Sequence, residues 1–400
     1  MTSGSMLADV VFVVLSIPCL ACAVYLGTLA VLSRALPNRP YLAPSTNFHV
    51  IVPAHDEERD IAVTVASLLA MDYPSEKRTI VVVADNCTDA TAALAREAGA
   101  TVLERHDTTR RGKGYALSDA FAVTLADPTV DAVVVVDADT QAGENLLRAF
   151  DACLRAGAAA VQADYCVANR TASWRTRLMH IGFTLFHDVR SRARERLGVS
   201  AGLRGNGMAF ATSLLRQVPH DAFTIVEDVE YGIRVGLAGH RVYYAGDARV
   251  FGQMPASAQA SRSQRQRWEG GRWWLVKHHA AHLIAEALRR RSLVLGDLAA
   301  DLLVPPLSYV ALASTAGAIA TMVRFARGGG AWWAALPWCL AVAGVAIYVA
   351  RGLWLAKAGP RVVLDLLHVP IYVVWKIALA LRRRPREGEW VRTRREGEPP

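Results

Sequence analysis

The fold of this chain is decided by the stretch Val133-Val134-Val135-Val136-Asp137-Ala138-Asp139-Thr140. Four consecutive β-branched residues predict a strand that is buried on both faces, as in a parallel sheet. The strand ends abruptly at two carboxylates, and ligands of open α/β sheets bind just beyond such carboxyl ends. Asp137 and Asp139 could therefore share a hard divalent cation, which substrate phosphates usually complete. An ordinary acidic turn is the alternative for the D-x-D taken alone.

The region from residue 45 to 253 alternates short apolar runs with helical patterns. The expected strands are 48–53, 79–84, 101–104 and 132–136, and the expected helices are 58–71, 90–98 and 115–125. Strands that alternate with helices predict a parallel sheet covered by helices. We therefore expect one α/β domain over residues 45–253.

An apolar segment precedes this domain. Val10–Leu32 carries no charge and is long enough to span a bilayer. Arg34 and Arg39 follow it, so the positive-inside rule places the N-terminus outside and residue 34 onward in the cytoplasm. The lack of a basic region before it argues against a cleaved signal peptide. The sequence therefore predicts a transmembrane helix over residues 7–33.

Further apolar segments follow the domain. Leu298–Val323 and Trp332–Leu355 predict two spans within residues 293–356, joined by an external turn at Gly328–Gly330. Residues 254–292 are expected to form interfacial helices. If Val362–Leu381 crossed the membrane, the Arg-rich tail would lie outside, against the positive-inside rule. Residues 361–400 are therefore expected to form an interfacial or re-entrant helix and a basic cytoplasmic tail.

The formal net charge of +9 is concentrated in blocks of arginine beside apolar or amphipathic stretches. This placement favours an anionic membrane surface, rather than nucleic acid, as the partner. Thr171–Leu197 interleaves arginines with aromatic and aliphatic residues, which predicts an amphipathic helix on the membrane face or a solvated surface helix. The six cysteines show no disulfide framework, which indicates a reducing, cytoplasmic setting.

Polar clusters also follow the second and third predicted strands. Asp85 stands directly after a buried strand, where a carboxylate can hydrogen-bond a base or a ribose. Helix capping by Thr88 or Asp89 is the competing explanation for that cluster. The sequence Arg110-Arg111-Gly112-Lys113-Gly114 is basic and rich in glycine, which suits the approach of a phosphate. It lacks the Walker A spacing.

Two acidic or basic motifs lie further along. Glu227-Asp228 follows the glycine-rich Gly205-Asn206-Gly207, and a carboxylate in a pocket could act as a general base. Helix capping ahead of residues 229–237 is the alternative. A Q-x-x-R-W motif is formed by Gln264, Arg267 and Trp268. An indole beside a guanidinium could stack on a sugar and neutralise phosphates, or could be a membrane-interface pair.

Together these motifs resemble the membrane-bound family-2 inverting glycosyltransferases, the group that contains cellulose, hyaluronan, chitin and poly-N-acetylglucosamine synthases. The resemblance covers roughly residues 47–275 and rests on an ordered set: Asp85, the D-x-D, the E-D pair and the Q-x-x-R-W. It implies a Rossmann-like GT-A nucleotide-sugar-binding domain embedded between transmembrane helices of the cell (inner) membrane.

The resemblance also implies a role for each motif. Asp228 would deprotonate the acceptor hydroxyl, and Asp137 and Asp139 would hold Mg²⁺ or Mn²⁺. The residues expected to bind the donor are Asp85, Lys113, Asp137, Gln264, Arg267 and Trp268. The residues expected near the acceptor are Asn206, Gly207, Glu227 and Trp268.

The expected reaction is metal-dependent, inverting transfer of a sugar from a nucleotide-diphosphate sugar, expected to be a UDP-sugar. The acceptor would be a growing poly- or oligosaccharide, with single transfer to a lipid as the alternative. The Q-x-x-R-W favours the processive enzymes, whereas three expected spans are few for a polymer-extruding member. An export or accessory subunit is therefore an expected partner if a polymer is made.

Overall fold

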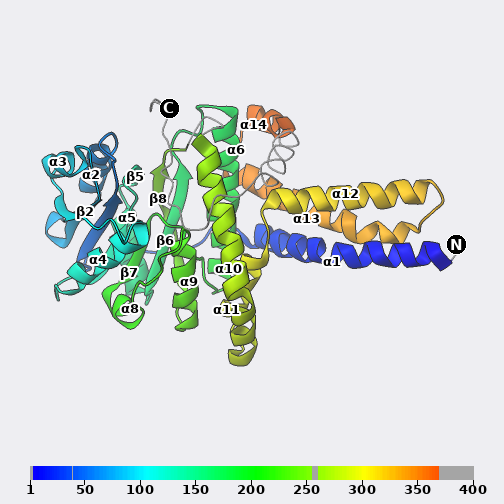
Figure 1. Cartoon of the computed structure of the whole chain (residues 1–400), viewed down its shortest axis with the longest axis horizontal. Coiled ribbons are helices and arrows are strands. Elements are labelled where there is room, and N and C mark those ends of the chain that lie inside the picture. The colour runs from blue at the N-terminus through cyan, green and yellow to red at the C-terminus, as the bar shows by residue number, and fades with distance from the viewer. Residues whose placement is uncertain (1–2, 38, 255–259, 369–400) are drawn as a thin grey trace.

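The computed structural model describes residues 3–37, 39–254 and 260–368 and consists of an α/β domain with a helical bundle projecting from it (Figure 1). The strands are β1 Phe48–Ala54, β2 Arg78–Asp85, β3 Thr101–Arg105, β4 Ala132–Val135, β5 Thr140–Ala142, β6 Ala160–Val167, β7 Met208–Ala211 and β8 Val242–Gly252. The helices of the domain are α2 Ile61–Leu69, α3 Thr91–Glu97, α4 Lys113–Leu125, α5 Leu146–Arg155, α6 Trp174–Phe183, α7 Arg190–Arg196, α8 Thr212–Gln217 and α9 Glu227–Leu237. The remaining helices are α1 Ser3–Leu32, α10 Ala260–Arg290, α11 Leu293–Leu303, α12 Leu307–Ala326, α13 Leu336–Leu355 and α14 Pro360–Asp365.

One mixed sheet forms the centre of the domain, with the strand order β3-β2-β1-β4-β7-β6-β8-β5. The predicted parallel arrangement is confirmed for β3, β2, β1 and β4. The other half of the sheet is mixed: β7 runs antiparallel to both β4 and β6, and β5 runs antiparallel to β8, whereas β6 and β8 are parallel. The valines of β4 are fully buried, as the β-branched run predicts.

Helices cover both faces of this sheet. Residues of α2, α3 and α5, among them Ile61, Ala95 and Phe150, pack with one face of the sheet. Residues of α4, α8 and α9, among them Phe121 and Leu214, pack with the other. The two apolar layers hold β4 in the middle, so its carboxyl end is fixed from both sides.

The predicted amphipathic helix 171–197 is present as α6, a π-helical segment η2 (Thr184–Val189) and α7. Its interpretation as a membrane-facing or solvated helix is wrong for part of its length. Arg190 and Arg194 are buried, and their guanidiniums bind Asp301 and Asp297 of α11. The sequence does not reveal this, because the partners lie about a hundred residues away.

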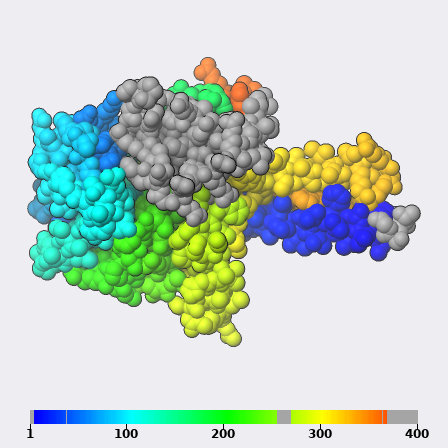
Figure 2. All heavy atoms as spheres, viewed as in Figure 1, coloured from blue at the N-terminus to red at the C-terminus, as the bar shows by residue number. Residues whose placement is uncertain are grey.

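Three helices are long and apolar enough to cross a membrane, namely Ser5–Leu32, Leu307–Ala326 and Trp332–Leu355. They lie side by side and form the stalk seen in Figures 1 and 2. Glycines allow close packing: a β-carbon on Gly344 of α13 would lie 2.8 Å from the carbonyl oxygen of Ala23 in α1. A β-carbon on Gly317 of α12 would overlap the indole of Trp338.

The predicted span 298–323 starts too early. Residues 293–303 form the separate helix α11, and Pro305 and Pro306 interrupt the chain before α12 begins at Leu307. Proline lacks the backbone donor that a helix interior needs, which explains the break. Helix α11 and the long helix α10 run across the foot of the stalk (Figure 1). Of the predicted interfacial segment 361–400, residues 369–400 lie outside the described residues.

Candidate active site

The D-x-D motif lies where β4 ends, as the sequence predicts. The backbone N–H of Asp137 donates to Oδ1 of Asn206 (3.1 Å), and Nδ2 of Asn206 donates to Oγ1 of Thr140 (2.7 Å). The side chain of Asn206 is fully buried. Asn206 was expected to contact the acceptor; instead, its amide clamps both ends of the D-x-D turn. It therefore fixes the direction in which the two carboxylates point.

Lys113 connects the D-x-D to the other acidic motif. Its Nζ donates to Oδ1 of Asp137 (2.5 Å) and to the carbonyl of Gly205 (2.5 Å), and lies 3.9 Å from Oε1 of Glu227. Burial works to lower the pKa of Lys113, but the carboxylates of Asp137 and Glu227 outweigh it and raise that pKa. The ammonium thus stays charged at the meeting point of three motifs.

The RGNG loop, which we define as Arg204–Gly207, requires its glycines. Gly205 and Gly207 have φ values of +80° and +64°, in the left-handed region that side chains rarely adopt. A β-carbon on Gly207 would lie 2.8 Å from Val250, and one on Gly205 would lie 3.3 Å from Oδ2 of Asp228. The loop therefore packs directly against the predicted base, and Gly207 is tightly packed against β8; its expected contact with the acceptor stays a prediction.

Glu227 and Asp228 begin helix α9, so their carboxyl groups lie at the positive end of the helix dipole. Burial raises the pKa of both groups, and their mutual repulsion adds to this for Glu227. For Asp228 the backbone N–H of Val229, Lys113 and Arg204 act in the opposite direction. Two adjacent buried carboxylates do not readily ionise together, so the pair is expected to share a proton.

The D-x-D has the donor set that a divalent cation requires. Burial raises the pKa of Asp139 to about 7, and the carboxylates of Asp137 and Glu57 contribute. A cluster of carboxylates with a single nearby ammonium is costly without further positive charge. Oxygen ligands of this kind suit Mg²⁺ or Mn²⁺. The residues present therefore fit the expected metal.

The predicted nucleotide-binding residue Asp85 ends β2. Its Oδ1 accepts from Nη1 of Arg105 (2.7 Å) and from Nδ2 of Asn86 (2.8 Å). Arg105 ends the neighbouring strand β3 and also binds Asp119 (2.6 Å). Arg105 was missed in the sequence, although its place at the end of a strand paired with β2 could have indicated it. Arg105 holds the Asp85 carboxylate in place at the carboxyl end of β2.

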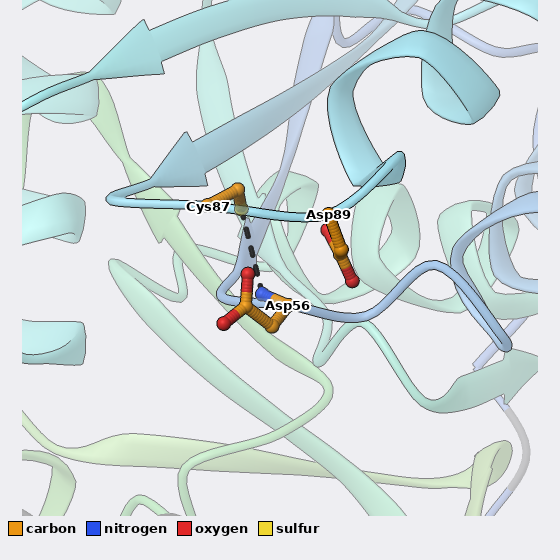
Figure 3. Close-up of side chains that lie close together, drawn as sticks. All are labelled: Asp56, Cys87 and Asp89. Carbon is orange, nitrogen blue, oxygen red and sulfur yellow. Dashed lines mark hydrogen bonds between the residues drawn. The ribbon is translucent and has the colours of Figure 1, made fainter.

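A second acidic group, comprising Asp56, Cys87 and Asp89, follows β1 and β2 (Figure 3). The backbone N–H groups of Thr88 and Glu58 donate to Asp56 (2.7 Å) and Asp89 (3.1 Å), respectively. These carboxylates thus tie two neighbouring loops together. The arrangement is explained by loop structure, and the D-x-D remains the better place for a metal.

The Q-x-x-R-W motif lies in the first turns of α10, and the side chains of Gln264, Arg267 and Trp268 are outside the described part of the chain. The helix itself passes close to the E-D pair. A β-carbon on Gly271 would lie 2.5 Å from Val226, the residue before Glu227. The helix that carries the motif is therefore packed next to the site, and the contacts of the three side chains stay a prediction.

Comparisons with known proteins identify the family and the fold. The model of the family described as "Glycosyltransferase like family 2" matches residues 44–271. The mannosyltransferase PcManGT from Pyrobaculum calidifontis, solved with GDP-Man and Mn²⁺, superposes with a TM-score of 0.53 at 20% identity, over 91% of this chain and 99% of that one. Its shared architecture shows the fold.

Curated relatives include a probable glycosyltransferase, YdaM, of Bacillus subtilis, which is 26% identical over 61% of this chain and 59% of its own length. The beta-monoglucosyldiacylglycerol synthase of Synechocystis is 29% identical over 56% of this chain and 47% of its own. The probable glucomannan 4-beta-mannosyltransferase 1 of Arabidopsis thaliana is 25% identical over 55% and 42%. The chain spans about half the length of the curated relatives it matches. The central α/β domain has the GT-A fold, and the chain belongs to glycosyltransferase-like family 2.

Proposed function

We propose that the protein transfers a single sugar from a nucleoside-diphosphate sugar to a lipid acceptor, with inversion, at the cytoplasmic face of a membrane. The observation that carries the transferase activity is the convergence of Lys113, Asp137 and the Glu227-Asp228 pair beside the RGNG loop. Two acidic centres that meet at one ammonium can serve different substrates. One suits a metal-bound diphosphate and the other a hydroxyl group.

The donor side of the site would be formed by the strand ends. Asp137 and Asp139 would hold Mg²⁺ or Mn²⁺, which would neutralise the leaving diphosphate when bound. PcManGT, with the same fold, was solved with Mn²⁺ and a nucleotide sugar, which supports this assignment. Lys113 would turn from Asp137 to a phosphate oxygen once the diphosphate is present. Asp85, held by Arg105, would meet the base or the ribose.

On the acceptor side, Asp228 would act as the general base. Its carboxylate would take the proton of the acceptor hydroxyl while that oxygen forms a bond to the anomeric carbon. The bond between the anomeric carbon and the diphosphate oxygen breaks, and the nucleoside diphosphate leaves with the electron pair. Attack from the face opposite the leaving group inverts the configuration.

The packing of the stalk favours a lipid acceptor over an extruded polymer. Helices α1 and α13 meet through Gly27 and Gly344, whose nearest approach is 3.6 Å for a β-carbon on Gly27. The indole of Trp338 in α13 packs against the backbone of α12 at Gly317. A polysaccharide could not pass between helices in such contact. The relative named beta-monoglucosyldiacylglycerol synthase is consistent with a lipid product.

A growing polysaccharide is the second candidate acceptor, and the Q-x-x-R-W sequence favours it. In that case a partner protein would have to supply the export path. The two candidates differ in product. Purified protein in phosphatidylcholine vesicles with added diacylglycerol and Mn²⁺ would be incubated with a panel of radiolabelled nucleotide sugars.

One labelled product that extracts into chloroform supports single transfer to a lipid. A ladder of water-soluble products supports polymerisation and rejects the lipid proposal. An Asp228→Asn variant tested in parallel should form neither product. If it forms the wild-type product at the wild-type rate, the assignment of the base is wrong.

A further inference from the structure

Helix α11, at the foot of the stalk, carries two buried aspartates one turn apart. Asp297 and Asp301 face the domain rather than solvent, with side chains that are 11% and 13% exposed. Neither residue belongs to the site proposed above. Carboxylates are rarely buried unless they are paired, so their partners indicate what the pair does.

Arginines of α7 bind both aspartates. Arg194, which is fully buried, contacts Asp297 through Nε (2.6 Å) and Asp301 through Nη1 (3.1 Å). Arg190 contacts Asp301 at 2.9 Å. A third guanidinium, that of Arg204, lies 3.9 Å from the same Asp301 carboxylate. We call these five residues the ionic hub.

Arg204 connects the hub to the reaction site, because it is the first residue of the RGNG loop. Its side chain is 4% exposed, lies over the ring of Phe186 at 4.0 Å and donates to the carbonyl of Ala201 (3.1 Å). The next residue, Gly205, packs against Asp228, and its carbonyl accepts from Lys113. A shift of Arg204 therefore moves the backbone that faces the base.

The hub is also joined to the membrane helices. Tyr25 of α1 donates to Asp297 (2.9 Å), and Tyr348 of α13 accepts from Nε of Arg190 (3.0 Å). Arg272 of α10 donates to carbonyls at the end of α11, among them that of Val304 (2.6 Å). Two spanning helices and the helix of the Q-x-x-R-W thus meet the RGNG loop through one group of charges.

Asp301 is the centre of this arrangement. Burial works to raise the pKa of its carboxyl, but the guanidiniums of Arg194, Arg190 and Arg204 hold that pKa well below its ordinary value. The carboxylate is therefore charged and is the shared partner of three arginines. Without it, three like charges would remain close together and would repel one another.

We propose that Asp301 is a positioning residue for sugar transfer. It holds the RGNG loop against Asp228 and connects the position of that loop to the position of the membrane helices. The inference rests on the proposed transferase function and assigns Asp301 no contact with either substrate. Its effect passes through Arg204. It predicts that turnover depends on Asp301 far more strongly than binding of the nucleotide does.

The test uses the full-length protein in vesicles and compares Asp301→Asn with Asp9→Asn. Asp9 is a matched control, because it is fully buried and pairs with an arginine, Arg324 (3.2 Å), at the opposite end of the stalk. For Asp301→Asn, kcat should fall by about 30- to 100-fold, since a displacement of about 1 Å at a reacting group can cost about a hundredfold. The Kd for nucleoside diphosphate with Mn²⁺ should change far less than kcat, because Asp301 contacts no substrate, and Asp301→Glu should recover part of the lost turnover.

A double-variant cycle separates positioning from general stability. If Asp301 acts through Arg204, the effects of Asp301→Asn and Arg204→Lys on kcat should be clearly less than additive. The inference alone fails if Asp301→Asn and Asp9→Asn turn over equally, or if the two hub variants are additive. If wild-type protein transfers sugar from no donor in the panel, the proposed function fails and the inference fails with it.

Discussion

Replacing Gly207 with alanine tests whether the RGNG loop is held as tightly as the structure indicates. An alanine there must adopt φ near +64°, which costs about 1–2 kcal/mol for an L-residue. Its β-carbon would also meet Val250 at 2.8 Å and Ala163 at 3.2 Å. Overpacking of this kind costs about 1–3 kcal/mol. The free energy of unfolding of the domain should therefore fall by about 2–5 kcal/mol.

The assay is thermal unfolding of the purified protein in detergent. A loss of this size corresponds to a decrease in Tm of about 5–15 °C for a domain of about 200 residues. Gly198→Ala is the matched control, because Gly198 has φ of +70° and no heavy atom within 4 Å of a β-carbon. It should show only the backbone cost of about 1–2 kcal/mol. In a Val250→Ala background, the penalty of Gly207→Ala should shrink toward that of the control.

The rate of sugar transfer should fall as well. The loop that carries Gly207 also faces Asp228, so a shift of about 1 Å should lower kcat by about a hundredfold. Equal decreases in Tm for Gly207→Ala and Gly198→Ala would refute the tight contact with β8. Unchanged turnover in folded Gly207→Ala protein would refute the link between the loop and the base.

Three further predictions concern the metal site and the stalk. Lys113→Met should tighten binding of Mn²⁺ alone by about tenfold, because the positive charge beside Asp137 is removed, yet should slow sugar transfer. Calorimetry measures the affinity for Mn²⁺, and a turnover assay measures sugar transfer. Weaker Mn²⁺ binding would contradict the ion pair with Asp137. The affinity for Mn²⁺ should fall as pH decreases below about 7, by up to about tenfold per pH unit, because Asp139 must lose its proton to bind the metal. The Kd for Mn²⁺ is measured from about pH 5.5 to 8. A Kd that does not change over this range would exclude Asp139 as the titrating ligand. Gly344→Ala should lower Tm in detergent, since its β-carbon would press on the backbone of α1. Gly182→Ala in α6, where no heavy atom lies within 4 Å of a β-carbon, should be neutral or stabilising by up to about 1 kcal/mol. The same direction of change in Tm for both variants would argue against close helix packing.

Local sequence patterns predicted the parts of the fold that depend on local physics. The valine run of β4 is buried on both faces because a central strand in a covered sheet has no exposed side. The polar residues after β1, β2 and β4 gather at one sheet edge, because parallel strands end on the same side. The order of the motifs was therefore sufficient to indicate a site.

Features that depend on distant partners were not predictable in this way. Arg190 and Arg194 have the pattern of an exposed basic helix, and only the later aspartates of α11 explain why they are buried. The direction of β7 depends on how the chain returns to the sheet after α7, which no local pattern encodes. The family resemblance implied that Asn206 lies near the acceptor, and no local pattern indicates that its amide binds both ends of the D-x-D turn.

The role of Asp228 as the base that activates the acceptor is the central claim, and one paired measurement tests it most directly. Donor binding and sugar transfer are measured on the same preparation of Asp228→Asn protein with Mn²⁺ present. We predict a donor Kd within about twofold of wild type and a transfer rate lower by roughly 10²- to 10⁴-fold, the range for loss of a general base. A variant that binds donor normally and transfers sugar within about threefold of the wild-type rate would contradict the account.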